Sequence, residues 1–221
     1  NRGGEFLKNT MNINKENSKT FLINTLRICL GLFITGIGTA MMYLVNWGSA
    51  PAATIGDGVH VAFHMSYGTA GILVNILFLI VLVFLDRSLI SIGTILATFF
   101  LGIFIDVGVF LIQPFYTDTF SVPAKAAILV LGGIITAIGL GYYVGVNFGI
   151  GAIDGMSVAL NKKFNIPFTV CRWGVDILIT LVGIALGGAW GAGTVVSVII
   201  TGPIMQVVIK YSQEFRKKHL K

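Results

Sequence analysis

The chain alternates between long apolar runs and short polar segments. A helix that crosses a lipid bilayer needs about 20 mostly apolar residues. Six runs come close to that length or exceed it with few charged positions, which predicts an all-α, polytopic membrane protein with six transmembrane helices. The predicted spans are Ile28–Asn46, Tyr67–Leu85, Ile90–Gln113, Ala126–Val146, Pro167–Gly187 and Thr194–Tyr211.

Two shorter segments, Ser49–Met65 and Gly151–Phe164, separate the first span from the second and the fourth from the fifth. Both carry ionisable side chains and are too polar to cross as ordinary spans, so we expect two short re-entrant or interfacial helices. If both segments crossed the membrane, the chain would have eight spans and parallel repeats. That alternative places Arg87 outside, against the preference of basic residues for the cytoplasmic side.

The two halves of the chain resemble each other. Gly31–Ala53 recurs as Gly132–Asp154 at an offset of 101 residues, and Gly93–Val107 recurs as Gly193–Val207 at an offset of 100. Glycine, threonine and asparagine take part in these matches, so apolar composition alone does not explain them, and they indicate a duplication. Three spans in each copy would turn the second copy upside down. Inverted repeats of this kind build many secondary transporters, which bind substrate near the midplane where the copies meet.

The repeats divide the chain into a simple order of segments. The predicted segments are a cloning remnant at 1–10 ahead of Met11, a cytoplasmic tail at 11–26, repeat 1 at 27–113, an external linker at 114–125, repeat 2 at 126–211 and a cytoplasmic basic tail at 212–221.

Composition supports a membrane location. Apolar residues make up 55% of the chain, charged residues 11%, and the mean hydropathy is +0.89, whereas soluble domains carry about 25% charged residues. The net charge of +6 comes mostly from the two ends, and basic residues beside membrane spans stay in the cytoplasm. We therefore expect a protein of the bacterial cytoplasmic membrane with both termini inside. Its partner is the lipid bilayer and not a nucleic acid.

Ionisable groups within membrane segments are costly, so they are the first candidates for a binding site. Arg172 and Asp176 lie four positions apart, which places them on one helix face, close enough to pair. They form either a structural ion pair or a substrate site, in which Arg172 receives an anionic group while Asp176 releases it or takes a proton. Asp154, at the predicted start of the second short helix, is either a helix cap or a substrate contact.

Three amides complete the predicted substrate site. Asn46 and Asn147 occupy the same position in the two copies, beside the short helices, and Asn75 corresponds to Asp176. These side chains either line a polar cavity or hydrogen-bond between helices.

Three other residues are candidates for proton coupling. Asp106 lies deep in the third span without a local partner, and it serves either a proton relay or a bond to a neighbouring helix. Asp57 and His60 belong to the pattern D-x-x-H-x-x-x-H, which ends at His64 and would place three polar groups on one helix face. Proton coupling through a histidine is one interpretation of this pattern, a plain polar face is another, and a transition-metal site is a third that we do not favour.

The motifs FGIGAIDG, CRWGVDILI and GTVVSVIITGPIMQVV, in this order, resemble the bacterial YczE/YyaS/YitT-type integral membrane proteins, in particular the YczE-like branch. The resemblance runs from Arg27 to Lys210 and implies an integral membrane protein without naming a substrate. The first-copy loop departs from the family pattern, because Ala52 and Ala53 stand where that pattern has a tryptophan and an aspartate. Asp57 follows about one helical turn later.

No enzyme signature is present: the chain contains no P-loop, G-x-S-x-G, H-E-x-x-H or dinucleotide fingerprint. We expect a transporter for a small, polar, charged metabolite, with proton coupling as an option and without a cofactor or resident metal. A substrate-binding membrane subunit of an energy-coupling-factor-like transporter and a non-transporting membrane scaffold are the alternatives. A homodimer and partner transporter subunits are both compatible with these functions.

Overall fold

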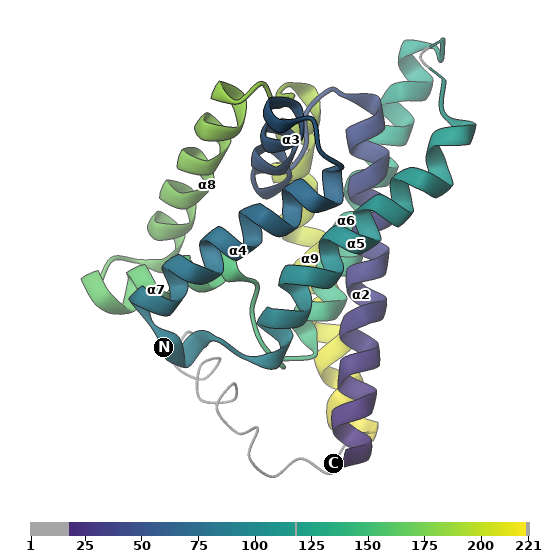
Figure 1. Ribbon diagram of the computed structural model, residues 1–221. Coiled ribbons are helices and arrows are strands. Elements are labelled where there is room, and N and C mark those ends of the chain that lie inside the picture. Colours follow the sequence, from purple (N-terminus) through teal and green to yellow (C-terminus); the bar gives the residue numbers. More distant parts are fainter. Residues whose placement is uncertain (1–17, 118, 220–221) are drawn as a thin grey trace.

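The computed structural model describes residues 18–117 and 119–219, and within them every regular element is helical (Figure 1). The α-helices are α2 (Ser18–Val45), α3 (Pro51–Phe63), α4 (Tyr67–Leu85), α5 (Ile92–Ile112), α6 (Val122–Gly145), α7 (Ala152–Phe164), α8 (Phe168–Ala185) and α9 (Ala192–His219), with the 3-10 turns η2 (Arg87–Leu89) and η3 (Gln113–Phe115).

The predicted elements correspond one to one with the α-helices, which confirms the all-α, polytopic fold class. The two short helices are α3 and α7, and the six predicted spans are α2, α4, α5, α6, α8 and α9. Within the described part of the chain, five helices are long and apolar enough to cross a membrane, namely α2, α4, α5, α6 and α9. The remaining helix, α8, has 18 residues, which gives it a length of about 27 Å, close to the ~30 Å hydrocarbon core. Its crossing stays a prediction.

Two predicted tails are helical in their described parts. We predicted a first span beginning at Ile28, but α2 begins at Ser18, and α9 continues past the predicted end of the last span as far as His219. The flanking residues are polar but mostly tolerated in helices, so a helix that is already nucleated within an apolar run extends through them. The predicted remnant at 1–10 lies outside the described residues.

The central packing unit is an antiparallel crossing of α2 and α6. A Cβ atom built at Gly38 would lie 2.5 Å from the backbone nitrogen of Thr136, and one built at Gly139 would lie 2.5 Å from Oγ1 of Thr35. Gly38 and Gly139 are equivalent positions in the two copies, and so are Thr35 and Thr136. Only glycine permits so close an approach, because any side chain would collide with the facing helix.

The reversals that follow α2 and α6 are equivalent too. Asn46 and Asn147 end these helices in the left-handed region, with φ of 57° and 55°. The segment after each reversal then bonds to the other copy: the Gly193 amide donates to the Trp47 carbonyl at 2.8 Å, and the Gly93 amide donates to the Phe148 carbonyl at 3.3 Å. These backbone bonds between the copies are therefore made twice, with the partners exchanged.

The copies differ in how their second and third long helices pack. We call the place where these two helices face each other the seam: α4 faces α5 in the first copy, and α8 faces α9 in the second. In the first copy α4 packs along α5, whereas the described residues of α8 and α9 share at most marginal contact. Gly102 is buried on α5, but its counterpart Gly202 on α9 is exposed. The α8 helix stands at the edge of the molecule (Figure 1), and its main packing partners are the short helices α3 and α7.

Candidate functional site

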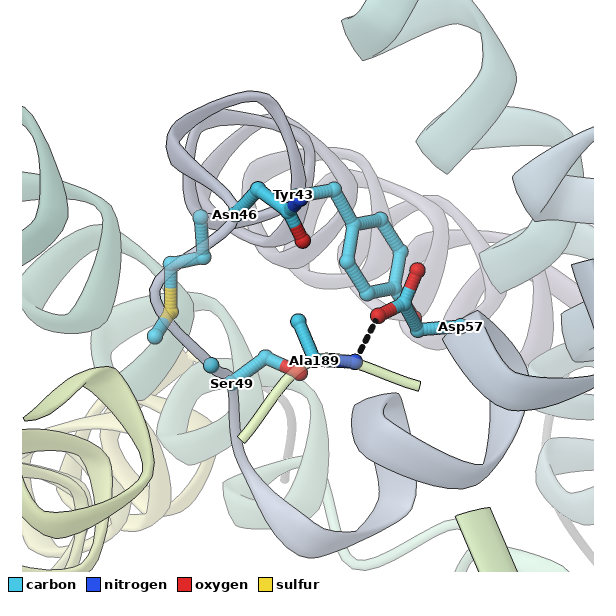
Figure 2. Close-up of a pocket in the computed structure, with 7 residues that line it drawn as sticks. Tyr43, Asn46, Ser49, Asp57 and Ala189 are labelled. Atoms are coloured by element: carbon cyan, nitrogen blue, oxygen red, sulfur yellow. Dashed lines mark hydrogen bonds between the residues drawn. The ribbon is translucent and has the colours of Figure 1, made fainter. Parts of the chain in front are cut away.

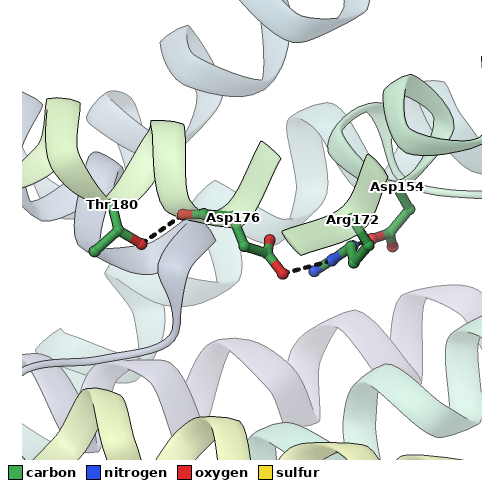
Figure 3. Close-up of polar contacts among 4 residues, drawn as sticks. All are labelled: Asp154, Arg172, Asp176 and Thr180. Carbon is green, nitrogen blue, oxygen red and sulfur yellow. Dashed lines mark hydrogen bonds and ion pairs between the residues drawn. The ribbon is translucent and has the colours of Figure 1, made fainter. Parts of the chain in front are cut away.

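A cluster of one guanidinium and two carboxylates joins α7 to α8 (Figure 3). Arg172 donates from Nε to Oδ2 of Asp176 at 2.8 Å, and from Nη1 to Oδ1 of Asp154. Asp154 lies in the first turn of α7, and the other two residues lie one turn apart on α8. The ion pair expected between Arg172 and Asp176 is thus present, and the fold adds Asp154 to it. We call these three residues the arginine cluster.

The arginine cluster is only partly shielded from its surroundings. The side chains of Arg172, Asp154 and Asp176 are 31%, 33% and 22% exposed. Within the described residues, Oδ1 of Asp176 is buried and accepts no hydrogen bond. Two carboxylates share one guanidinium, so the cluster can exchange one of its internal bonds for a bond to a charged ligand.

The charges of this cluster belong to the second copy alone. The first-copy counterparts of Asp154, Arg172 and Asp176 are Ala53, Gly71 and Asn75. The Asn75 side chain donates to the Gly71 carbonyl of its own helix at 2.9 Å. The duplication therefore supplied two equivalent positions for the site, but only one of them carries charge.

A second polar group surrounds Asp57, which is 5% exposed and accepts a 2.6 Å hydrogen bond from the backbone N–H of Ala189 (Figure 2). Burial raises the pKa of the Asp57 carboxyl, although the Ala189 N–H acts in the opposite direction. The carboxylate borders a narrow pocket that leaves no room for a water-sized molecule. Its lining residues are Met42, Tyr43, Asn46, Gly48, Ser49, Asp57 and Ala189.

His60 has partners in the loop after α3 and at the start of α4. Its ring stacks on Tyr67 with centroids 3.8 Å apart, and Nδ1 contacts the Met65 carbonyl. Asn161, the second-copy counterpart of His60, donates to the Ile166 carbonyl at 2.7 Å and ties the same turn. His60 is therefore in a position where a polar side chain holds the end of a short helix.

The histidine pattern does not place three groups on one helix face. The α3 helix ends at Phe63, and His64 follows in the left-handed region with φ of 52°. The sequence suggested a longer helix because the pattern D-x-x-H-x-x-x-H fits helical spacing. The early end of α3 moves His64 away from that spacing.

Asp106 has partners that the sequence did not indicate. It accepts hydrogen bonds from Oγ of Ser66 at 2.6 Å and from the backbone N–H of Gly68 at 2.7 Å. These groups lie at the start of α4, where the free N–H groups of a helix need acceptors. Sequence analysis found no local partner because Ser66 and Gly68 are about 40 residues away along the chain.

Of the predicted amides, Asn46 lies beside the Asp57 pocket, and Asn147 ends α6 in the corresponding reversal. None of the residues of the arginine cluster lines that pocket. The predicted site residues therefore fall into separate groups, with the arginine cluster between α7 and α8 and the Asp57 pocket at the end of α2.

Sequence analysis did not single out Tyr43 or Arg27. The Tyr43 ring stacks on Tyr67 at 4.5 Å, and its hydroxyl donates to the Ala53 carbonyl at 2.9 Å. Arg27 is 5% exposed and donates from Nη2 to the carbonyl and the hydroxyl of Ser212, both at 2.9 Å. Arg27 lies immediately before the first predicted span, and the basic residues of the two ends were interpreted only as an orientation signal.

Comparison with known proteins adds the family. The profile described as a family of unknown function (DUF6198) matches residues 22–210. An uncharacterized protein of Haemophilus influenzae is 27% identical over 179 residues, which cover 81% of this chain and 80% of that protein. The uncharacterized membrane protein YczE of Bacillus subtilis is 26% identical over 186 residues, which cover 82% and 83%. These matches confirm the resemblance to the YczE-like branch. No solved structure matches the chain.

Proposed function

We propose that this chain, which belongs to the family of unknown function DUF6198, is a transporter for a small, charged metabolite, built from two inverted three-helix units. The supporting observation is the set of contacts that the two copies make twice. Gly38 faces Thr136 as Gly139 faces Thr35, and these contacts lie on helices that run in opposite directions. A two-fold axis perpendicular to α2 and α6 relates such pairs, and that is the symmetry of inverted-repeat transporters.

In this proposal the arginine cluster binds the substrate. Arg172 is held by two carboxylates, so an anionic group of the substrate would replace one of them at the guanidinium. A cationic group of the substrate would then bind to the carboxylate that has been displaced. A buried structural ion pair would be expected to lie fully inside the packing, whereas these side chains are about a fifth to a third exposed. That exposure favours a binding role.

Proton coupling is assigned to Asp57. Of the three candidates, Asp106 is bonded to the start of α4, and His60 is bonded to the Met65 carbonyl. Asp57 is buried next to the narrow pocket, and it makes no salt bridge within the described residues. A buried carboxylate without a cation reduces its cost by taking up a proton.

The orientation follows from the basic residues. The start of α2 and the end of α9 lie at the same end of the molecule (Figure 1), where Arg27 contacts Ser212. In the proposed topology this end faces the cytoplasm of a bacterial cell, together with Lys162 and Lys163 of α7.

Counterflow in proteoliposomes tests the transport function. The purified protein is reconstituted, and a library of amino acids, carboxylic acids and amines is screened for exchange of labelled compound. We expect at least one compound to be moved by the wild type and not by Arg172→Gln. The matched control is Lys163→Gln, an exposed cation at the end of α7, and it should leave the exchange unchanged.

Two outcomes would contradict the proposal. Exchange that is equal in wild type and Arg172→Gln would remove the arginine cluster from the site. A purified wild type that binds a compound but exchanges none would favour a substrate-binding subunit that needs an ATPase.

A separate variant tests the role of Asp57. Asp57→Asn cannot ionise, so the dependence of exchange on an imposed pH gradient should be lost while equilibrium exchange persists.

A further inference from the structure

The face of α9 around Gly202 has a specific unfilled place, and we infer that α8 docks there in a second conformation and so closes over the arginine cluster. The inference rests on the proposed function, because it describes how access to that site is controlled. It is carried by the difference between the two seams, since in the first copy the equivalent place on α5 is filled by α4.

The first-copy seam is closed by two facing glycines. A Cβ atom at Gly68 would overlap the carbonyl oxygen of Gly102, and one at Gly102 would lie 2.5 Å from Cγ1 of Ile72. Asp106, one turn further along α5, then accepts its hydrogen bonds from Ser66 and Gly68. Close backbone contact and a polar bond together hold α4 on α5.

The second-copy seam has the corresponding residues without the contacts. Nothing lies within 4 Å of a Cβ atom built at Gly202, the counterpart of Gly102. Trp173, the counterpart of Ile72, is 65% exposed, and Val198, the counterpart of the buried Thr98, is 64% exposed. The glycine that admits a neighbouring helix in the first copy therefore faces no helix in the second.

The described packing of α8 involves α9 at most marginally. Its extensive contacts are with the short helices α3 and α7, and not with the crossing of α2 and α6. The connection from α8 to α9 contains Gly187 and Gly191 with φ of 94° and 156°, a region that other residues rarely adopt. Glycines can absorb the backbone change that a hinge requires, and the bond from the Ala189 N–H to Asp57 holds the connection in its present conformation.

The movement would affect the proposed site directly, because Arg172 and Asp176 are on α8. Docking of α8 on α9 would move both side chains, which are 31% and 22% exposed in this structure, together with the helix. Trp173 would lie against Gly202, as Ile72 lies against Gly102. The open seam is then the conformation that admits a substrate, and the docked seam is the conformation that encloses it.

Cysteine cross-linking tests the inference in membranes. Cys29 and Cys171 are first replaced by serine. The pair Trp173→Cys and Gly202→Cys is then treated with copper phenanthroline, and free thiols are counted by the mass added by a maleimide polymer. The control pair is Ser66→Cys and Asp106→Cys, because the native side chains at these two positions meet across the first-copy seam at 2.6 Å. In each pair we expect the two cysteines to form a disulfide within one chain, so that both free thiols are lost. The loss should be slower in the Trp173/Gly202 pair than in the control pair.

Two results would overturn the inference. In the first, the free thiols of the Trp173/Gly202 pair persist while those of the control pair are consumed. In the second, the product has twice the mass of the chain, which would mean that a second copy of the protein covers this face. Ile177→Cys with Val198→Cys, one turn further along α8 and one turn earlier on α9, provides a second pair should the first fail to fold. Cross-linking does not require transport, so docking without any exchange would contradict only the proposed function, and exchange without docking would contradict only this inference.

Discussion

The two seams of this protein begin from the same sequence repeat and end in different packing. In the first copy α4 lies on α5, with Gly68 and Gly102 in contact and Asp106 bonded across the seam. In the second copy α8 and α9 are apart, and the corresponding Gly202 is exposed. The sequence differs where the first seam is made: Thr169 stands in place of Gly68, and Gln206 in place of Asp106.

This difference separates a part of the molecule that is the same in both copies from the seams, which differ between the copies. The crossing of α2 and α6 and the two chain reversals are equivalent in both copies, so they form a frame whose contacts are made twice. In the first copy, polar side chains form bonds within the fold: Asp106 of α5, for example, accepts hydrogen bonds from the start of α4. The arginine cluster of the second copy keeps exposed side chains beside an open seam, and exposed charges are available to a ligand.

The largest effect is expected for a large side chain in the closed seam. Gly102→Leu would overlap Ile72 and the backbone of Gly68, so we expect it to lower the free energy of unfolding by about 2 kcal/mol or more. Gly202→Leu has open space and should leave the unfolding transition in detergent nearly unchanged, while it reduces exchange by preventing α8 from docking. Equal destabilisation by both substitutions would show that the second seam is also closed.

A smaller loss is expected for the polar bond across the first seam. Asp106→Ala removes the acceptor for Ser66 and Gly68 and should cost about 1–2 kcal/mol, the usual effect of losing a helix cap. Gln206→Ala, at the exposed counterpart, should change stability by less than about 0.5 kcal/mol. Thermal unfolding of the two variants side by side measures the difference, and a reversed order would contradict the comparison.

A modest effect on stability is expected at the arginine cluster. Arg172→Gln leaves Asp154 and Asp176 near each other without their shared cation, but these groups are partly exposed, so the cost should be about 1 kcal/mol. Adding Asp176→Asn to that variant removes one of the facing carboxylates and should recover part of the loss. A loss of several kcal/mol would instead indicate a structural ion pair and weaken the case for a binding site.

The smallest effect is expected at the ion pair between Lys162 of α7 and Asp86 at the end of α4, 3.0 Å apart. Burial opposes ionisation of Asp86, but hydrogen bonds from Ser88 and the ammonium of Lys162 outweigh it and lower the pKa of the carboxyl below 3.8. Asp86 therefore stabilises the fold at pH values above 3.8, and this contribution is lost as the pH falls through the lowered pKa. Lys162→Gln should flatten that part of the acid unfolding curve.

The matched control for this pair lies in the other copy. Gly187 and Val61 occupy the positions that correspond to Asp86 and Lys162, and they meet without any charge. Val61→Ala should therefore leave the acid unfolding curve unchanged in shape. A change of shape with Val61→Ala would mean that the pH dependence arises elsewhere in the molecule.

The apolar runs predicted the α-helices well, because a membrane helix satisfies its own backbone hydrogen bonds and needs only enough length and low polarity. The sequence also indicated Arg172 with Asp176, since four positions along a helix bring side chains together. It did not indicate the partners of Asp106 or Arg27. Those contacts join α5 to the start of α4 and α2 to the end of α9, at separations that local spacing does not describe.

The amino-acid sequence by itself determined the helices, the duplication and the positions where glycine allows two helices to approach closely. Only the tertiary structure decided which of those glycines receives a neighbour: Gly102 does and Gly202 does not, although they occupy equivalent positions of the repeat. The physical reason is that helix formation depends on bonds within a few residues, whereas the closure of a seam depends on how side chains distant in the sequence fit together.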